Sequence, residues 1–420
     1  MIVKAISRLA RPILARGAAT CPWKNMDNYY NYEFTSKPKF IEQTERHPLF
    51  RVIDLEGNVI APEYELLDKD FLTKALETMI FSREMDEVYN NAQRQNRITF
   101  YMKTTYQEAE SIGVVSGIEP QDTLFLQYRD FLLHMHRGAS ALTVLNNLKG
   151  NKNDLNLGKC MPLTMFNVEK NIFPTSAPLG NRNTQSVGAG YLYRVKGEDR
   201  VAMCFFGEGA ASEGDFHAGI NFASTLGSQT LYICRNNCHA ISTFREDQYA
   251  GDGIAARGLG YGVPAIKVDG NDLLAVYAAT KRARALVIER KGPVLVETYS
   301  YRGGDHSTSD SAASYRTKER MEILDKYLKL IGDPLPRLTK YMEKKGYLKD
   351  SAAWMKKVAE KARAECLSNL KKIDEIKMAN YNNMFTDVYG NEHWNIKEQR
   401  EELSTLIKKY PEAYPTQEYP

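Results

Sequence analysis

The feature that most constrains the fold is a regular alternation of apolar runs and helical segments between residues 201 and 298. Apolar runs occupy 201–206, 230–234, 265–268 and 294–298, and helical spacing occupies 212–226 and 272–290. Short runs that are apolar throughout are typical of strands buried on both faces of a sheet. Such strands alternating with helices predict an α/β fold with a doubly wound parallel sheet of the type that binds a ligand at its carboxyl edge.

The sequence outside this core predicts four regions. Residues 1–20 hold four basic side chains and no acidic one among apolar residues, which is typical of a mitochondrial presequence, with a plain basic tail as the alternative. Residues 21–65 are expected to form an extended N-terminal arm, and 66–317 the α/β domain. Residues 318–420 are charged and predict a C-terminal helical region with an irregular tail.

Further elements are expected on both sides of the alternating core. Helical spacing predicts a helix at 70–93, capped by Asp68 or Asp70, and another at 105–116. A short strand is expected at 123–127, and the stretch 146–185 is rich in Gly, Asn and Pro, which favours loops.

Charge and cysteine content exclude several classes of protein. The chain has 56 basic and 52 acidic residues, so without residues 1–20 its body is neutral and offers no basic face for nucleic acid. No apolar stretch is long enough to span a membrane. The six cysteines form no C-x-x-C pair, so neither a disulfide framework nor a zinc site is indicated.

Polar residues follow two of the expected strands where the strands end. Gly207, Glu208 and Gly209 come after the first strand, and Arg235 and Asn237 after the second. Because the carboxyl ends of parallel strands meet at one edge, Glu208 and Asn237 are expected to share a crevice. Their oxygens suit Mg²⁺ that also binds diphosphate, and Arg235 is a candidate diphosphate ligand.

Three other nucleotide motifs do not fit this sequence. The G-x-G-x-x-G fingerprint fails because position 212 is serine, no G-K-[ST] is present, and the glycines at 251 and 253 follow no apolar strand. An ordinary β-α-β unit with a polar turn remains an open alternative on spacing alone.

The amino-acid sequence of these segments resembles that of a known family. Gly207-Glu208-Gly209, then 26 residues, then Asn236-Asn237 is similar to the thiamine diphosphate motif. The surrounding FFGEGAASEGDFHAGINFAS and ICRNNCHAIST, with GDGIAARGLGYG, VDGNDLLAVYAAT, HSTSDSAASYR, QRQNRITFYM, QYRD and FTDVYGNEHW, closely resemble alpha subunits of branched-chain 2-oxo acid dehydrogenases. The pyruvate dehydrogenase alpha subunit shares the motif but resembles the region after 318 less.

The resemblance implies a set of site residues. The diphosphate half of the cofactor would be held by Tyr128, Arg129, Ala177, Leu179, Gly209, Ala210, Arg235 and His306. Magnesium would be bound by Glu208, Asn237 and the carbonyl of His239. Ser176, Pro178 and Asn181 match a potassium loop, and Ser307 a regulatory phosphorylation site, with Thr317 at the position of a second serine.

The resemblance also implies a reaction, partners and a compartment. The expected activity is oxidative decarboxylation of branched-chain 2-oxo acids with transfer of the acyl group to lipoyl-lysine, in the mitochondrial matrix. His306 would be the catalytic residue, aiding hydrogen bonding or proton transfer. Two alpha and two beta chains would complete the site, with a lipoyl-bearing acyltransferase core, a regulatory kinase and a phosphatase as further partners.

Five positions depart from the family pattern: Thr164 in place of a histidine, Arg182 in the potassium loop, Cys238 and His239 in place of Gly-Tyr, and Asp305 in place of a second histidine. Thr164 is expected to weaken proton chemistry, and Arg182 makes the potassium site doubtful. Cys238 matters only if its backbone needs positive φ, and with His239 it offers a site for a softer metal. Asp305 is expected to raise the pKa of His306. A diverged, weakly active or non-catalytic alpha-like subunit therefore remains the second hypothesis.

Overall fold

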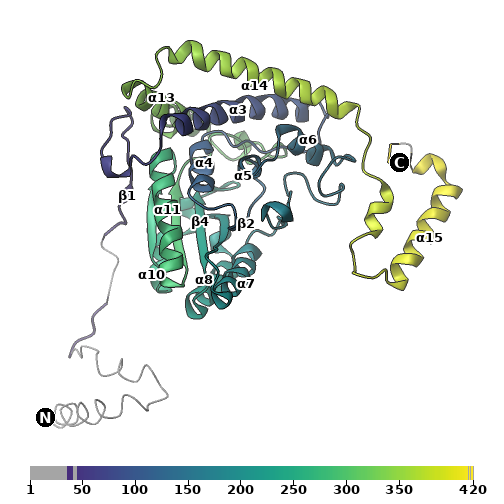
Figure 1. Ribbon diagram of the computed structural model, residues 1–420, viewed down its shortest axis with the longest axis horizontal. Coiled ribbons are helices and arrows are strands. Elements are labelled where there is room, and N and C mark those ends of the chain that lie inside the picture. Colours follow the sequence, from purple (N-terminus) through teal and green to yellow (C-terminus); the bar gives the residue numbers. More distant parts are fainter. Residues whose placement is uncertain (1–35, 41–44, 415, 417, 420) are drawn as a thin grey trace, which may run out of the picture. The chain divides into compact units, whose positions relative to one another are not determined.

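The computed structural model describes residues 36–40, 45–414, 416 and 418–419 (Figure 1). The expected presequence and residues 21–35 of the expected arm lie outside this part of the chain. Residues 47–420 form one compact unit, and every element below belongs to it.

Six parallel strands form the central sheet in the order β1-β7-β8-β4-β3-β2. The strands are β1 (Leu49–Phe50), β2 (Thr123–Phe125), β3 (Ala202–Gly207), β4 (Thr230–Asn236), β7 (Ala265–Asp269) and β8 (Val294–Tyr299). A small antiparallel pair, β5 (His239–Ala240) and β6 (Thr243–Phe244), follows β4. The predicted α/β class and parallel sheet are confirmed.

Helices cover both faces of this sheet and continue into the C-terminal region (Figure 1). They are α3 (Lys69–Arg94), α4 (Glu108–Ser116), α5 (Phe131–His136), α6 (Ala141–Lys149), α7 (Asn181–Lys196), α8 (Gly214–Leu226), α9 (Arg245–Gln248), α10 (Ala255–Gly260), α11 (Leu273–Arg290), α12 (Lys318–Tyr327), α13 (Pro334–Lys344), α14 (Ser351–Asp374) and α15 (Trp394–Lys409). No helix among the described residues is long and apolar enough to cross a membrane.

Strand β3 shows why the runs are apolar throughout. Met203 and Phe205 belong to a core shared with α4 and α11, whereas Cys204 and Phe206 pack in a second core with α7 and α8. Successive side chains of a strand point to opposite faces, so a sheet covered on both sides needs apolar residues at every position.

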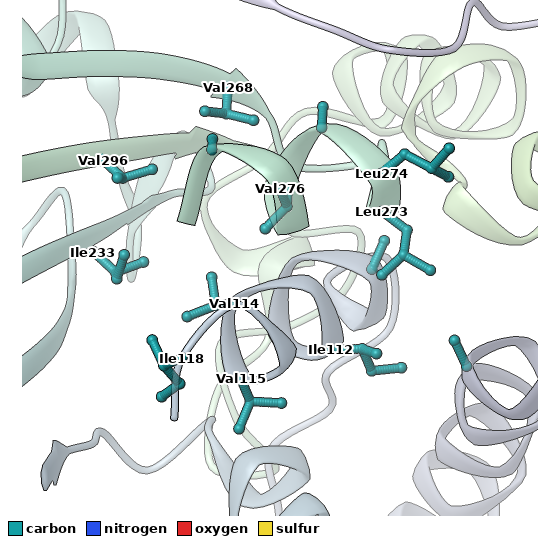
Figure 2. Close-up of a cluster of buried hydrophobic side chains, with 14 of the residues drawn as sticks. Ile112, Val114, Val115, Ile118, Ile233, Val268, Leu273, Leu274, Val276 and Val296 are labelled. Carbon is teal, nitrogen blue, oxygen red and sulfur yellow. The ribbon is translucent and has the colours of Figure 1, made fainter. Parts of the chain in front are cut away.

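The larger core lies between α4, α11 and the sheet (Figure 2). In that view Val114 of α4 and Val276 of α11 approach Ile233 of β4 and Val296 of β8. All four side chains are fully buried. This packing fixes the strands, and with them the loops at the carboxyl edge of the sheet.

The structure tests the expected cap of α3 and the expected loops over 146–185. The predicted cap of α3 is confirmed, because the Asp68 carboxylate accepts a hydrogen bond from Phe71 N at 2.8 Å. The expectation of loops over 146–185 is wrong at both ends, where α6 runs to Lys149 and α7 begins at Asn181. The buried face of α7 consists mainly of polar and small residues, so it carries no apolar period.

Candidate functional site

The carboxyl ends of β3 and β4 bring the two expected metal ligands together. Gly207 is paired with Arg235 in the sheet, so Glu208 and Asn237 leave the sheet at neighbouring positions. Asn237 N donates to the Glu208 carboxylate at 3.3 Å, and both side chains are buried. The predicted shared crevice of these two residues is therefore present.

Glu208 is a buried carboxylate with one oxygen that lacks a hydrogen-bond partner in the described part of the chain. Its Oε1 atom has no hydrogen-bond partner among the described residues. Burial raises the pKa of Glu208 to about 7, because it outweighs the backbone N–H groups, Arg302 and Gln248, which favour the charged form. The amide oxygen of Asn237 lies beside it and accepts from His239 N at 3.3 Å. A carboxylate and an amide oxygen form a donor set that fits Mg²⁺.

These residues open into a cleft of about 360 Å³ at the edge of the sheet. The lining comprises Gln127, Tyr128, Arg129, Ala177, Leu179, Gly207, Glu208, Gly209, Ala210, Glu213, Arg235, Asn237, His239, Ala240, Ile241 and His306. All the residues expected to hold the cofactor or magnesium are in this lining, although they come from five separate segments of the chain.

Gly209 is required by a close approach of the chain to itself. A Cβ atom at this position would lie 2.7 Å from the Cβ of Ala240 in β5. That distance is shorter than side-chain carbons tolerate, so β5 can close against the turn after β3 only if residue 209 is glycine. The turn leads through Ala210 into α8.

Arg129 ties the far wall of the cleft together. Its guanidinium donates to Lys103 O at 2.7 Å and to His306 O at 3.0 Å, and no carboxylate of the described residues forms an ion pair with it. Burial lowers the pKa of Arg129 to about 10, so it stays a cation at neutral pH. This positive charge faces a cleft that also holds the unpaired Glu208.

His306 completes this wall as a neutral imidazole. Its ring meets Tyr128 edge-on, with 5.9 Å between ring centroids. Burial first, and then the charges of Arg129 and Arg302, lower the pKa of His306 to about 4. The expectation that Asp305 raises this pKa is wrong, because the Asp305 carboxylate accepts from Ala312 N at 2.7 Å instead.

Comparison with known proteins bears on what this cleft binds. The sequence profile of the dehydrogenase E1 component family matches residues 76–382. The chain is 39% identical over 401 residues to the 2-oxoisovalerate dehydrogenase subunit alpha, mitochondrial, of Dictyostelium discoideum, covering 95% of this chain and 89% of that protein. The proteins of the same name from Caenorhabditis elegans and Homo sapiens are 38% and 37% identical, each over 91% of this chain and over 88% and 85% of their own lengths.

The chain belongs to the dehydrogenase E1 component family. The resemblance noted from the sequence is thereby confirmed, and membership implies thiamine diphosphate as the cofactor of a 2-oxo acid dehydrogenase. Nothing in these comparisons favours the pyruvate dehydrogenase alternative.

Arg235 was expected to bind the diphosphate, but its guanidinium is paired with two carboxylates. The guanidinium lies 3.2 Å from the carboxylate of Glu110 and 2.9 Å from that of Asp130, and both carboxylates are fully buried. It also donates to Ser111 at 3.0 Å and stacks 4.5 Å over the ring of Phe205. Its charge is already balanced, so Arg235 lines the cleft chiefly as part of the scaffold.

The expected potassium loop is closed on itself. The Ser176 hydroxyl lies 3.2 Å from Pro178 O and 3.1 Å from Asn181 Oδ1, within hydrogen-bond distance of both. Arg182 follows with 2% of its surface exposed, and its Nε has no partner in the described part of the chain. The Ser176 hydroxyl is thus engaged within the loop, and potassium binding by these residues stays a prediction.

Residues 238 and 239 depart from the family without losing the turn. Cys238 has φ of +67°, so the backbone does need the left-handed conformation that glycine adopts most easily. The His239 ring lies between Phe244 and Tyr301, with centroids 4.7 and 5.2 Å away, and burial lowers its pKa to about 3. Among the described residues, no group of three or more His, Cys, Asp or Glu side chains is placed to hold a metal ion.

Thr164 does not line the cleft. Its hydroxyl donates to Met161 O at 2.6 Å, within its own turn, and the side chain is buried. The structure of this chain therefore gives no support to the expectation that position 164 faces the reacting centre.

The loop that carries Ser307 borders the cleft through His306. Ser307 is 9% exposed, and its hydroxyl oxygen accepts from Ser309 N at 3.2 Å. Thr317 lies outside the loop and caps α12 by accepting from Arg320 N at 3.2 Å.

Sequence reasoning missed Arg302, which joins this loop to the metal turn. Arg302 N donates to Asn237 O at 3.2 Å, and its guanidinium donates to Ile241 O at 2.6 Å and lies 3.4 Å from His306 Nδ1. The only signal in the sequence was its place four residues before His306.

Proposed function

We propose that the chain is the catalytic alpha subunit of a branched-chain 2-oxo acid dehydrogenase. It would decarboxylate branched-chain 2-oxo acids oxidatively and transfer the acyl group to lipoyl-lysine. The observation that carries this proposal is the unpaired Glu208 carboxylate beside Asn237, in a cleft that also holds Arg129 and His306. The names of the relatives supply the substrate class.

The cofactor would be held through its diphosphate. Glu208, Asn237 and the carbonyl of His239 would bind Mg²⁺, and the turn at Gly209 and Ala210 would take the phosphate oxygens, with the charge of Arg129 opposite. When bound, thiamine diphosphate supplies the carbon nucleophile that attacks the 2-oxo group and accepts the electrons released by decarboxylation.

His306 would act as a neutral hydrogen-bonding group. Its Nδ1 atom faces the guanidinium groups of Arg129 and Arg302 at 3.5 and 3.4 Å, both of which can only donate. Nδ1 is therefore the acceptor, and the ring proton is on Nε2, from which it can be donated. Because the pKa of His306 is near 4, the ring can also accept a proton and release it at neutral pH without being trapped as a cation.

The names of the relatives support a proposal for the assembly and the compartment. We propose two alpha and two beta chains, the beta chains completing each cleft, bound to a lipoyl-bearing acyltransferase core. The relatives are named mitochondrial, and we place this chain in the mitochondrial matrix. Neither nucleic acid nor a membrane is a proposed partner.

Regulation is proposed at Ser307, by a kinase and a phosphatase. A phosphoryl group there would displace the hydrogen bond from Ser309 N and place about two negative charges close to Asp310, whose carboxylate accepts from His306 N at 2.8 Å. Repulsion between the two would pull the His306 loop away from the cleft.

The direct test is turnover of the chain assembled with its partner beta chain. We expect release of carbon dioxide from 2-oxoisovalerate, with a higher kcat/KM than from pyruvate. Binding of thiamine diphosphate without any release would favour the non-catalytic subunit instead, the hypothesis suggested by the sequence departures at Thr164, Arg182 and Cys238. Preference for pyruvate would overturn the substrate assignment.

A further inference from the structure

The loop that carries His306 is joined to a neighbouring segment by a reciprocal pair of hydrogen bonds. Thr308 N donates to Tyr101 O at 3.0 Å, and Tyr101 N donates to the Thr308 hydroxyl at 3.0 Å. The threonine side chain thus takes the place that a strand carbonyl would have in a ladder. Thr308 is 8% exposed and Tyr101 is fully buried, so neither backbone group of Tyr101 has water as an alternative partner.

Tyr101 is itself hydrogen-bonded to α3, the longest helix in the described part of the chain. Its hydroxyl donates to Asp86 of α3 at 2.9 Å, and the same carboxylate accepts from Thr104 N and from the Thr105 hydroxyl, each at 2.8 Å. Arg94, also on α3, donates to Thr308 O at 3.3 Å. The loop is therefore attached, directly and through Tyr101, to a 26-residue helix and not only to another loop.

The attachment at Thr308 has a counterpart on the cofactor side. Arg129 donates to Lys103 O and to His306 O, so it joins the same two segments two residues away from the Thr308–Tyr101 pair. Arg129 lines the cleft, whereas Thr308 and Tyr101 do not. The contribution of Thr308 can therefore be removed without touching a residue that meets the cofactor.

We propose that Thr308 is a positioning residue, which holds His306 over the cleft through its paired hydrogen bonds with Tyr101. This inference rests on the proposed function for the identity of the ligand, but its structural part does not. Thr308→Val keeps the shape of the side chain and removes the acceptor, leaving Tyr101 N–H buried without a partner. An unmet buried donor shifts the closed-to-open equilibrium of the loop by about tenfold.

The test uses the assembled alpha–beta complex and two measurements. Hydrogen exchange of the 304–315 peptide is followed in the absence of cofactor, and affinity for thiamine diphosphate with Mg²⁺ is measured by calorimetry. Thr308→Val should speed exchange of that peptide and weaken cofactor affinity, each by about tenfold. Thr308→Ser, which keeps the hydroxyl, should restore both to within about twofold, and Ser309→Ala, at the exposed next position, should change neither.

The controls separate this role from general stability and from the proposed function. Peptides of α3, β3 and β4 should exchange as in the unmodified chain. Exchange at 304–315 that is unchanged in Thr308→Val, or that rises throughout the molecule, would overturn the proposal. A different outcome is that neither the unmodified chain nor any variant binds the cofactor while Thr308→Val still exchanges faster at 304–315. That result would refute the proposed function and leave the positioning role of Thr308 intact.

Discussion

Replacing Arg235 with methionine should destabilise the chain far more than its place in the cleft suggests. The guanidinium is 1% exposed and is the shared partner of Glu110 and Asp130, both fully buried. Methionine fills a similar volume but removes the ion-pair partner of both buried carboxylates. Removing one partner of a buried ion pair costs about 3–5 kcal/mol.

The unfolding entropy converts this loss into a temperature. For a unit of the size of residues 47–420 it is roughly 0.8 kcal/mol per kelvin, so the midpoint of thermal unfolding should fall by about 4–6 °C. Scanning fluorimetry of the alpha–beta complex measures this shift. Arg363→Met is the matched control, since Arg363 makes an exposed pair with Glu84 at 3.2 Å and should shift the midpoint by about 1 °C or less.

The pH dependence of the Arg235 variant tests the cause. Burial raises the pKa of Glu110 and of Asp130 even with Arg235 present, and removing the cation raises both further. A folded-state pKa above the unfolded one costs stability at high pH, and the cost shrinks as the pH falls toward the folded value. The deficit of the variant should therefore be smaller at pH 5.5 than at pH 8. A midpoint within 1 °C of the unmodified protein would refute this account of Arg235.

Three further predictions concern other sites. Cys238→Gly should be more stable than Cys238→Ala by about 0.5–1 kcal/mol, as judged by urea midpoints, since only alanine keeps the cost of positive φ; the opposite order would contradict the backbone argument. Burial lowers the pKa of His134 to about 4, so the unfolded chain takes up this proton first and stability falls as the pH drops through 6.5. His134→Gln should therefore lose about 1.5 kcal/mol less stability between pH 6.5 and 5, and identical pH profiles would count against this reasoning. Ser307→Glu should lower turnover of the complex at least tenfold without changing its thermal midpoint by more than about 1 °C, whereas full activity would argue against control at this loop.

Much of the fold could be predicted because burial leaves a direct trace in the sequence. Strands β3, β4, β7 and β8 begin and end within two residues of the apolar runs, since both faces of each strand are covered. Helix α7 was missed because its inner face carries Asn183, Ser186 and Gly190, whose close packing replaces apolar bulk.

The site could be predicted only where adjacent strands of the sheet bring its residues together. Glu208 and Asn237 follow adjacent strands, so their meeting could be inferred from the parallel sheet. The pairing of Arg235 with Glu110 and Asp130, and the turning of Asp305 toward Ala312, are tertiary contacts between distant or looping segments. Spacing carries no information about such contacts, and they decide the charge state of the cleft.

The measurement that tests the central claim is Mg²⁺-dependent binding of thiamine diphosphate to the assembled alpha–beta complex, compared with Glu208→Ala by calorimetry. The unmodified complex should bind the cofactor only with Mg²⁺, and the variant should lose affinity by about 100-fold or more, since a direct metal ligand is removed. Its thermal midpoint should change by no more than about 1 °C, because the long hydrogen bond from Asn237 N is offset by the cost of burying Oε1 without a partner. Glu246→Ala, which removes an exposed carboxylate nearby, should bind normally. Equal affinity of Glu208→Ala and the unmodified complex would contradict the assignment of this cleft.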